Sequence, residues 1–262
     1  MKNFITILKT DFYRAFLSSG FGIGIFSTVA IFYFGSVGMI SHNVSAVAAF
    51  NNTFKYNNIS NLFILSATFA YTASFCTDWQ TRFAFSIIIR GEKITYALSK
   101  CISVAVAGGL AVAIGAAVFI GYVCVMQPSI LPEAIQIEME FSNEAFGDLL
   151  VKGKEALFFL SYLYIIFLQA VFFSSLGLMV SAYMPNKYVA YISPFALSFM
   201  LNQIANVFNL PIWLDPVKLA TARIWGSSAS TILWMATATF LSLTVICDIL
   251  FIRTVKRRIA NG

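Results

Sequence analysis

Residue types that carry chemistry are few in this sequence, and their spacing does not assemble a catalytic site. His42 is the only histidine, HExxH is absent, and the four cysteines form no C-x-x-C pair, so a histidine-based triad and a metal cage are nearly excluded. Glu138 and Glu140 have no partner acid or base, and a solvated acidic loop is the better interpretation. The P-loop pattern GxxxxGKS/T is also absent. The sequence therefore predicts a protein that is not an enzyme and holds no metal or cofactor of its own.

Polar side chains inside or beside apolar runs are the remaining candidates. Asn202, Gln203 and Asn206 lie near the far end of one apolar run, where amides either join helices or line a pathway. Asp248 lies near the end of the last apolar run. It is either an interfacial acid that is paired or solvated, or a functional acid within the membrane. Both alternatives stay open for each of these groups.

The composition places these residues in a bilayer. Of the 262 residues, 59% are hydrophobic and 11% are charged, with 27 phenylalanines, and the mean hydropathy is +0.82. Soluble domains carry about 25% charged residues. We expect an all-α integral membrane protein with a single transmembrane domain, residues 1–262.

Six apolar runs are long enough to be predicted as membrane spans, since a spanning helix needs about 20 apolar residues. They cover about 20–41, 61–77, 101–126, 156–183, 188–208 and 229–252. Residues 1–16 predict a basic amphipathic helix at the membrane interface. The other segments are a polar loop at 42–60, an external segment at 127–155 and a re-entrant or interfacial segment at 209–228. The small residues of 101–126 favour close helix contacts.

Lysine and arginine gather on one side of this topology. Three lie at the N-terminus, four in 78–100, one in the turn at 184–187 and four at the C-terminus, which makes twelve of the seventeen. The positive-inside rule places this side, with both termini, in the cytoplasm. Seven of the eleven acidic residues lie on the other side. The net charge of +6 therefore reflects topology, and no nucleic-acid partner is expected.

The charged segment between the second and third spans is predicted to be an amphipathic helix over residues 78–91. Polar residues recur every four positions and form one stripe: Asp78, Arg82, Ser86 and Arg90. Asp78 and Arg82 are placed for an i,i+4 ion pair. A neighbouring apolar stripe contains Trp79, Phe83 and Ile87. Gly91 is suited to end the helix. Such a helix either docks in a partner's cleft or lies on lipid.

The chain resembles an ABC type-2 exporter permease. The resemblance rests on the six spans and on a few positions of residues 78–100: Asp78 after the second span, the Arg90-Gly91 break, and Tyr96 with Ser99-Lys100 at the foot of the third span. The family more often has Glu at the position of Asp78. The external segment 127–155 is a second departure.

The resemblance implies that the 78–91 segment is a cytoplasmic coupling helix that docks on a separate ATPase subunit, which binds ATP and magnesium. The docking residues would be Asp78, Trp79, Arg82, Phe83, Arg90 and Gly91. A second copy or a sibling permease would complete the pathway, lined by the second and fifth spans, with Asn202, Gln203 and Asn206 facing it. We expect the plasma membrane of a bacterium and an amphipathic cargo, such as a peptide toxin or an antimicrobial peptide.

Two other functions compete with this expectation. One is a six-span scaffold or sensor without an ATPase, and the other is a secondary carrier driven by ions. Co-purification of an ATP-binding protein distinguishes the exporter from the scaffold. Flux that follows an ion gradient without ATP identifies the carrier.

Overall fold

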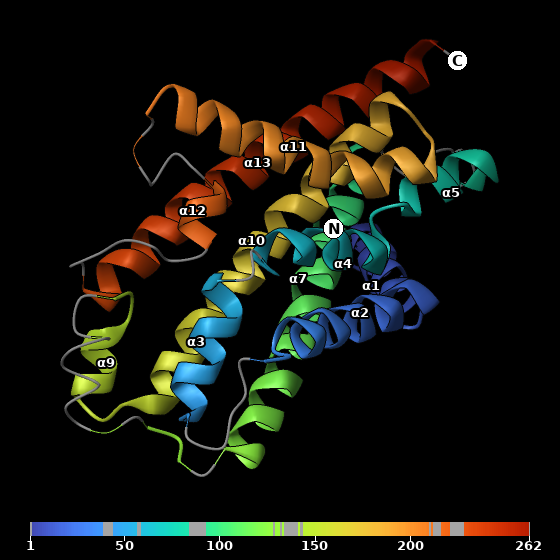
Figure 1. Cartoon of the computed structure of the whole chain (residues 1–262). Helices are drawn as coiled ribbons and strands as arrows, with labels where there is room; N and C mark the ends of the chain where they lie inside the picture. Colours follow the sequence, from blue (N-terminus) through green and yellow to red (C-terminus); the bar gives the residue numbers. More distant parts are fainter. Residues whose placement is uncertain are drawn as a thin grey trace.

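The computed structural model describes residues 2–38, 44–56, 59–83, 93–127, 129–131, 133, 141, 144–209, 211, 216–220 and 228–261. All regular structure in these residues is helical, as expected from the sequence. The helices are α1 (Lys2–Phe16), α2 (Ser19–Gly35), α3 (Ala46–Tyr56), α4 (Ile59–Tyr71), α5 (Ser74–Gln80), α7 (Lys93–Met126), α9 (Gly147–Val151), α10 (Glu155–Tyr183), α11 (Lys187–Val207), α12 (Pro216–Ala220) and α13 (Ala229–Asn261) (Figure 1).

Three helices in the described part of the chain are long and apolar enough to cross a membrane: Lys93–Met126, Glu155–Tyr183 and Ala229–Ile259. A bent pair, Phe4–Phe16 with Ser19–Gly35, makes a fourth span if its two helices, which meet at 50°, are counted together. The predicted spans 101–126, 156–183 and 229–252 fall within the three long helices. Six spans are not confirmed.

The other predicted spans coincide with shorter or more polar helices. The span at 20–41 corresponds to α2, which has 17 residues, and the span at 188–208 corresponds to α11, which has 21 residues and contains Pro194. The span at 61–77 is interrupted, because α4 ends at Tyr71 and α5 begins at Ser74. The Ala70 carbonyl would accept from the Ser74 amide in a continuous helix. At the break, the Ala70 carbonyl lies 3.2 Å from the Ser18 hydroxyl at the start of α2, which also donates to the Ala15 carbonyl at 2.7 Å.

Helix α7 lies at the centre of the bundle and packs against α1, α2, α4, α10 and α13. Its small residues allow this, as predicted. A Cβ atom added at Gly115 would lie 2.6 Å from Thr28 Cβ on α2. One added at Gly108 would overlap the Ser174 hydroxyl on α10. Lipid gives no hydrophobic drive for helices to associate, so close contacts of this kind hold the bundle together.

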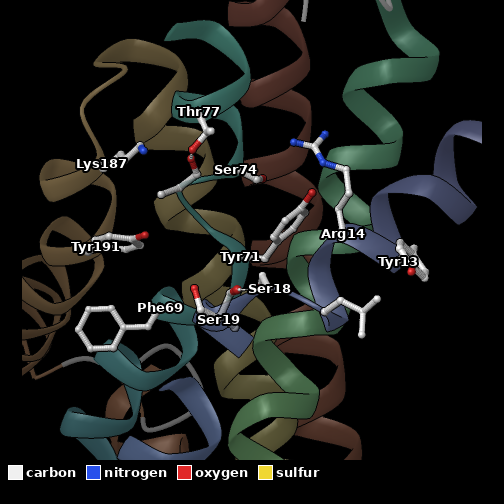
Figure 2. Close-up of a pocket in the computed structure, with 14 residues that line it drawn as sticks. Tyr13, Arg14, Ser18, Ser19, Phe69, Tyr71, Ser74, Thr77, Lys187 and Tyr191 are labelled. Carbon is white, nitrogen blue, oxygen red and sulfur yellow. Dashed lines mark hydrogen bonds between the residues drawn. The ribbon is translucent and has the colours of Figure 1, made fainter. Parts of the chain in front are cut away.

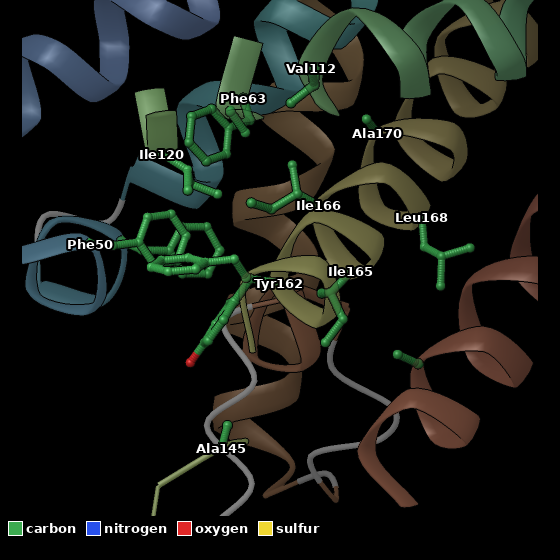
Figure 3. Packing of buried hydrophobic residues seen from close by; sticks show 14 of the residues in the cluster. Phe50, Phe63, Val112, Ile120, Ala145, Tyr162, Ile165, Ile166, Leu168 and Ala170 are labelled. Atoms are coloured by element: carbon green, nitrogen blue, oxygen red, sulfur yellow. The ribbon is translucent and has the colours of Figure 1, made fainter. Parts of the chain in front are cut away.

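The segment predicted as a polar loop at 42–60 contains helix α3, which is buried on one face. Phe50 and Phe54 are fully buried, and their rings pack with Phe32 of α2 and Tyr162 of α10. Figure 3 shows Phe50, Phe63 and Tyr162 converging from three helices. The amide of Ala46, at the start of α3, donates to the Ser129 carbonyl beyond the end of α7. The prediction of a loop is therefore wrong for residues 46–56.

The described residues of the segments at 127–155 and 209–228 also pack against the bundle. In the first segment, the Asp148 carboxylate accepts from the backbone amide of Ala229, and so contacts the first residue of α13. In the second, Leu219 of α12 is fully buried. The alternating residues at 135–140 lie outside the described part of the chain. Which side of a membrane these segments occupy stays a prediction.

Candidate functional site

Four charged side chains meet where α1, α5 and the foot of α7 come together. We call them the ionic cluster: Asp11 and Arg14 from α1, Asp78 from α5 and Lys100 from α7. The Lys100 ammonium lies 2.8 Å from Asp11 Oδ1 and 2.8 Å from Asp78 Oδ2. The Arg14 guanidinium lies 2.7 Å from Asp78 Oδ1. Two positive and two negative side chains therefore balance within one contact network.

Helical periodicity brings these groups inward. Asp11 lies one turn before Ala15, and both face α7 from the buried side of α1. Lys100 lies between Ala97 and Val104 on the buried face of α7. The break after α4 allows the short helix α5 to place Asp78 against this surface. Each charge thus lies on an otherwise apolar face, where only a paired group is tolerated.

Hydroxyl groups complete the network. Ser99 donates to Asp11 Oδ2 at 2.6 Å, and Tyr96 donates to Asp78 Oδ2 at 3.0 Å. Lys100 also donates to the Tyr71 hydroxyl at 3.3 Å. All four carboxylate oxygens of Asp11 and Asp78 therefore have a donor. The three protons of the ammonium have three acceptors.

The electrostatic balance keeps the Asp78 carboxylate ionised. Burial alone would raise the pKa of Asp78, because it disfavours the charged form. The charge of Lys100 and the hydrogen bonds from Arg14 and Lys100 outweigh burial, and the pKa of Asp78 lies below its ordinary value. Every carboxylate oxygen of this ionised network has a donor, while one guanidinium nitrogen of Arg14 has no hydrogen-bond partner among the described residues. The network links α1, α5 and α7. It leaves no carboxylate oxygen without a donor to act as a base.

The structure corrects two expectations for residues 78–91. Asp78 is fully buried, and it pairs with Arg14 and Lys100 instead of forming the predicted i,i+4 pair with Arg82. A single helix over 78–91 is also wrong, because α5 ends at Gln80 and Arg82 adopts a left-handed conformation with φ of 57°. Such a residue typically ends a helix.

The remaining predicted docking residues divide into two groups. Trp79 is half-buried, its ring packs on Phe75, and the Arg258 guanidinium lies 5.6 Å from it. Arg82 and Phe83 are exposed, with the Arg14 guanidinium 4.7 Å from the Phe83 ring. Arg90 and Gly91 lie outside the described residues. Docking on a partner stays a prediction for this segment.

The three amides of α11 lie beside α12. Asn206 donates to Asn202 at 3.3 Å and accepts from Lys218 at 2.6 Å, and Gln203 is exposed. This local chain of hydrogen bonds joins α11 to α12. A role in lining a pathway stays a prediction.

Asp248 lies farther inside its helix than the sequence suggested. Helix α13 continues to Asn261, so Asp248 falls within the candidate span Ala229–Ile259. Its carboxyl group faces Cys101 of α7 and Ser175 of α10. Among the described residues, the Asp248 Oδ1 atom has no hydrogen-bond partner. Whether Asp248 lies at the interface or within the membrane stays a prediction.

Sequence reasoning missed the roles of Asp11 and Arg14. A signal was present, since Asp11 falls on the apolar stripe of α1, three residues after Leu8 and four before Ala15. An acid on the buried stripe of a helix needs a cation opposite it, and Lys100 at the foot of a predicted span was the obvious partner.

Comparison with known proteins assigns no family to this arrangement. No family model matches the sequence, and neither a curated protein nor a solved structure matches the chain.

Proposed function

We propose that this chain is the permease subunit of an ATP-driven exporter of the ABC type-2 kind, located in a bacterial plasma membrane. A separate ATPase subunit would bind ATP and magnesium and dock on the segment that follows Asp78. A second copy of the chain or a sibling permease would form the other half of the pathway.

The ionic cluster is the observation that carries this proposal. It holds Asp78, the last buried residue before the exposed pair Arg82 and Phe83, to α1 and to the foot of α7. A partner that moves the exposed residues would therefore pull on two other helices at once. A coupling element needs this connection, and a loop that only rests on lipid does not.

The cargo would be amphipathic, such as a peptide toxin or an antimicrobial peptide. The support is the apolar surface of α13, which exposes Trp234, Leu241, Val245, Ile246 and Ile249. Side chains of this kind suit an apolar cargo or lipid better than a polar sugar chain.

Co-purification tests the proposal. The tagged chain is isolated from the native membrane, and co-purifying proteins are labelled with a photoreactive ATP analogue. We expect one ATP-labelled protein, reduced at least about tenfold by Arg82→Glu, because charge reversal at the centre of an interface costs 1.4 kcal/mol or more. The matched control is Lys256→Glu, because Lys256 is an exposed lysine on α13. Absence of any ATP-labelled protein, or equal loss with both variants, contradicts the proposal.

One observation favours a second function, an ion-driven carrier. Asp248 is an acid within a candidate span, and such groups mark ion pathways in carriers. Vesicles containing the purified chain and a pH-sensitive dye test this. Proton movement that needs no ATP and is abolished by Asp248→Asn would support the carrier, and its absence would remove this alternative.

A further inference from the structure

A cavity lined by polar and apolar side chains lies beside the ionic cluster, between α1, α2, α4, α5 and the start of α11. Its volume is about 430 Å³, within the range of about 300–1,000 Å³ that small-ligand sites occupy. Figure 2 shows Arg14 of α1 on one side and Lys187 of α11 on the other, with Tyr71 between them. Five helices therefore contribute to one concave surface.

The charges around this cavity favour an anion. Arg14 and Lys187 line it from opposite walls, and none of its lining residues is acidic. Asp11 and Asp78 balance the charges of Lys100 and Arg14 within the ionic cluster, and neither carboxylate lines the cavity, so Lys187 supplies the uncompensated positive charge. Within the described part of the chain, Lys187 forms no ion pair and its side chain is exposed. A net positive charge is therefore available there.

Some of the neutral groups that line the cavity are hydrogen-bond donors. Ser74 is only 7% exposed, and its hydroxyl has no partner among the described residues. Ser19 and Gly20 begin α2, so their backbone amides belong to the first turn of a helix of 17 residues. Amides at such a terminus, together with the helix dipole, favour negative charge. Serine hydroxyls, amides and two cations form a donor set that suits phosphate oxygens.

Apolar side chains are exposed beside the cavity. Leu17, one of its lining residues, is 67% exposed, and α2 continues from there with Ile23 and Phe26 exposed. A ligand with a phosphate head and hydrocarbon chains would place the head in the cavity and its chains along α2. Basic pockets between helices hold anionic headgroups in this way.

We propose that this cavity binds the phosphate group of an anionic phospholipid. The bound lipid would bridge Arg14 of α1 and Lys187 of α11, and would hold the two helices together next to the ionic cluster. Lipid binding at this cavity does not require an ATPase partner, so its test is independent of the exporter proposal.

Thermal stability and native mass spectrometry of the purified full chain test the lipid site. The probes are phosphatidylglycerol, zwitterionic phosphatidylcholine and inorganic phosphate, each added to the chain in detergent. We expect phosphatidylglycerol to raise the unfolding temperature and to remain bound in the spectrometer, with phosphatidylcholine much weaker. Lys187→Gln should reduce retained phosphatidylglycerol about fivefold, the effect of losing one charge-assisted contact.

The variants are chosen so that folding does not confound the result. Lys187 is exposed and outside the ionic cluster, and Lys256→Gln on α13 is the matched loss of one exposed charge. Ser74→Ala removes the buried hydroxyl and should also weaken retention. Stabilisation by phosphatidylglycerol alone supports a lipid site, and equal stabilisation by inorganic phosphate reassigns the cavity to a soluble phosphate. No stabilisation by either probe, or equal loss with Lys187→Gln and Lys256→Gln, overturns the proposal.

Discussion

Lys100 is a charged residue held inside a helix bundle, in a helix long enough to span a membrane. Its side chain is fully buried, and its ammonium contacts Asp11, Asp78 and Tyr71. Removing one member of a buried ion pair leaves the other charges without compensation, which costs more than the pair gains when it forms. The ionic cluster is therefore more sensitive to single substitutions than to balanced ones.

The first prediction concerns this imbalance. Lys100→Met should destabilise the chain by about 3–5 kcal/mol, because two carboxylates then share one guanidinium. Unfolding in mixed detergent measures the change, with Lys256→Met on the exposed face of α13 as the control. Adding Asp11→Asn to Lys100→Met restores the charge balance and should recover stability. A double variant no more stable than Lys100→Met would show that the charges are not coupled.

The second prediction concerns pH. The pKa of Asp78 is lower in the folded chain than its ordinary value of about 3.9. The unfolded chain therefore binds the proton first as pH falls. The stability that Asp78 contributes is complete above the ordinary pKa and is lost as pH falls through the lower folded value. Asp78→Asn should therefore be less stable than the wild type at neutral pH.

The measurement is unfolding in detergent from neutral pH down to about pH 2, where aspartates become protonated. Because the variant lacks this carboxylate, its stability should fall less than that of the wild type over the acid range. Parallel curves for the two proteins would contradict a depressed pKa at Asp78.

At the scale of elements, α7 determines how closely its neighbours approach. Gly115 faces α2 so closely that an added Cβ atom would lie 2.9 Å from the Ile25 carbonyl, and backbone cannot move aside as a side chain can. Gly121, two turns later on the same helix, would place a Cβ atom in open space. The two glycines are therefore a matched pair.

The third prediction compares them. Gly115→Ala should cost about 1–3 kcal/mol by forcing α2 and α7 apart. Gly121→Ala should be neutral or slightly stabilising, since alanine favours a helix more than glycine does. Thermal unfolding of both variants in the same detergent measures the difference. Equal effects would contradict the close contact between α2 and α7.

Apolar length predicted some elements well and others poorly. The runs that became α7, α10 and α13 were predicted because twenty or more apolar residues leave little alternative to a long helix. Helix α3 was missed because its asparagines made the segment look like a polar loop. Its apolar residues Ala46, Phe50 and Phe54 lie on one face, which is buried only by contacts with other helices. The break after Tyr71 was also missed, because no glycine or proline marks it in the sequence.

The sequence pointed to two of the four members of the ionic cluster, Asp78 and Lys100, but not to their contacts. Tyr96, Ser99 and Lys100 were picked out as a motif, and Asp78 was expected on an exposed stripe. Burial of Asp78 could not be read from local spacing, because the periodicity of 78–91 assumed one helix. The partner that changes its role, Arg14, belongs to a helix more than sixty residues away, and only tertiary structure brings the two together.

At the scale of the whole molecule, α5 joins the N-terminal and C-terminal helices. Asp78 bonds to Arg14 of α1, and Trp79 lies beneath Arg258 near the end of α13. Arg258 also donates to the Tyr183 carbonyl at the end of α10. Movement of α5 would therefore reach α1, α7 and α13 together, which the exporter proposal requires of the segment that begins there.

Photo-crosslinking from the exposed end of this junction tests that requirement most directly. Phe83 is replaced by benzoylphenylalanine in the full chain, and membranes from the native host are irradiated. The control places the same residue at Phe34, which is 72% exposed and close to the end of α2. We predict an adduct from position 83, absent from position 34, in which mass spectrometry finds a protein with a P-loop. Adducts from position 83 with lipid or with this chain alone would contradict the account.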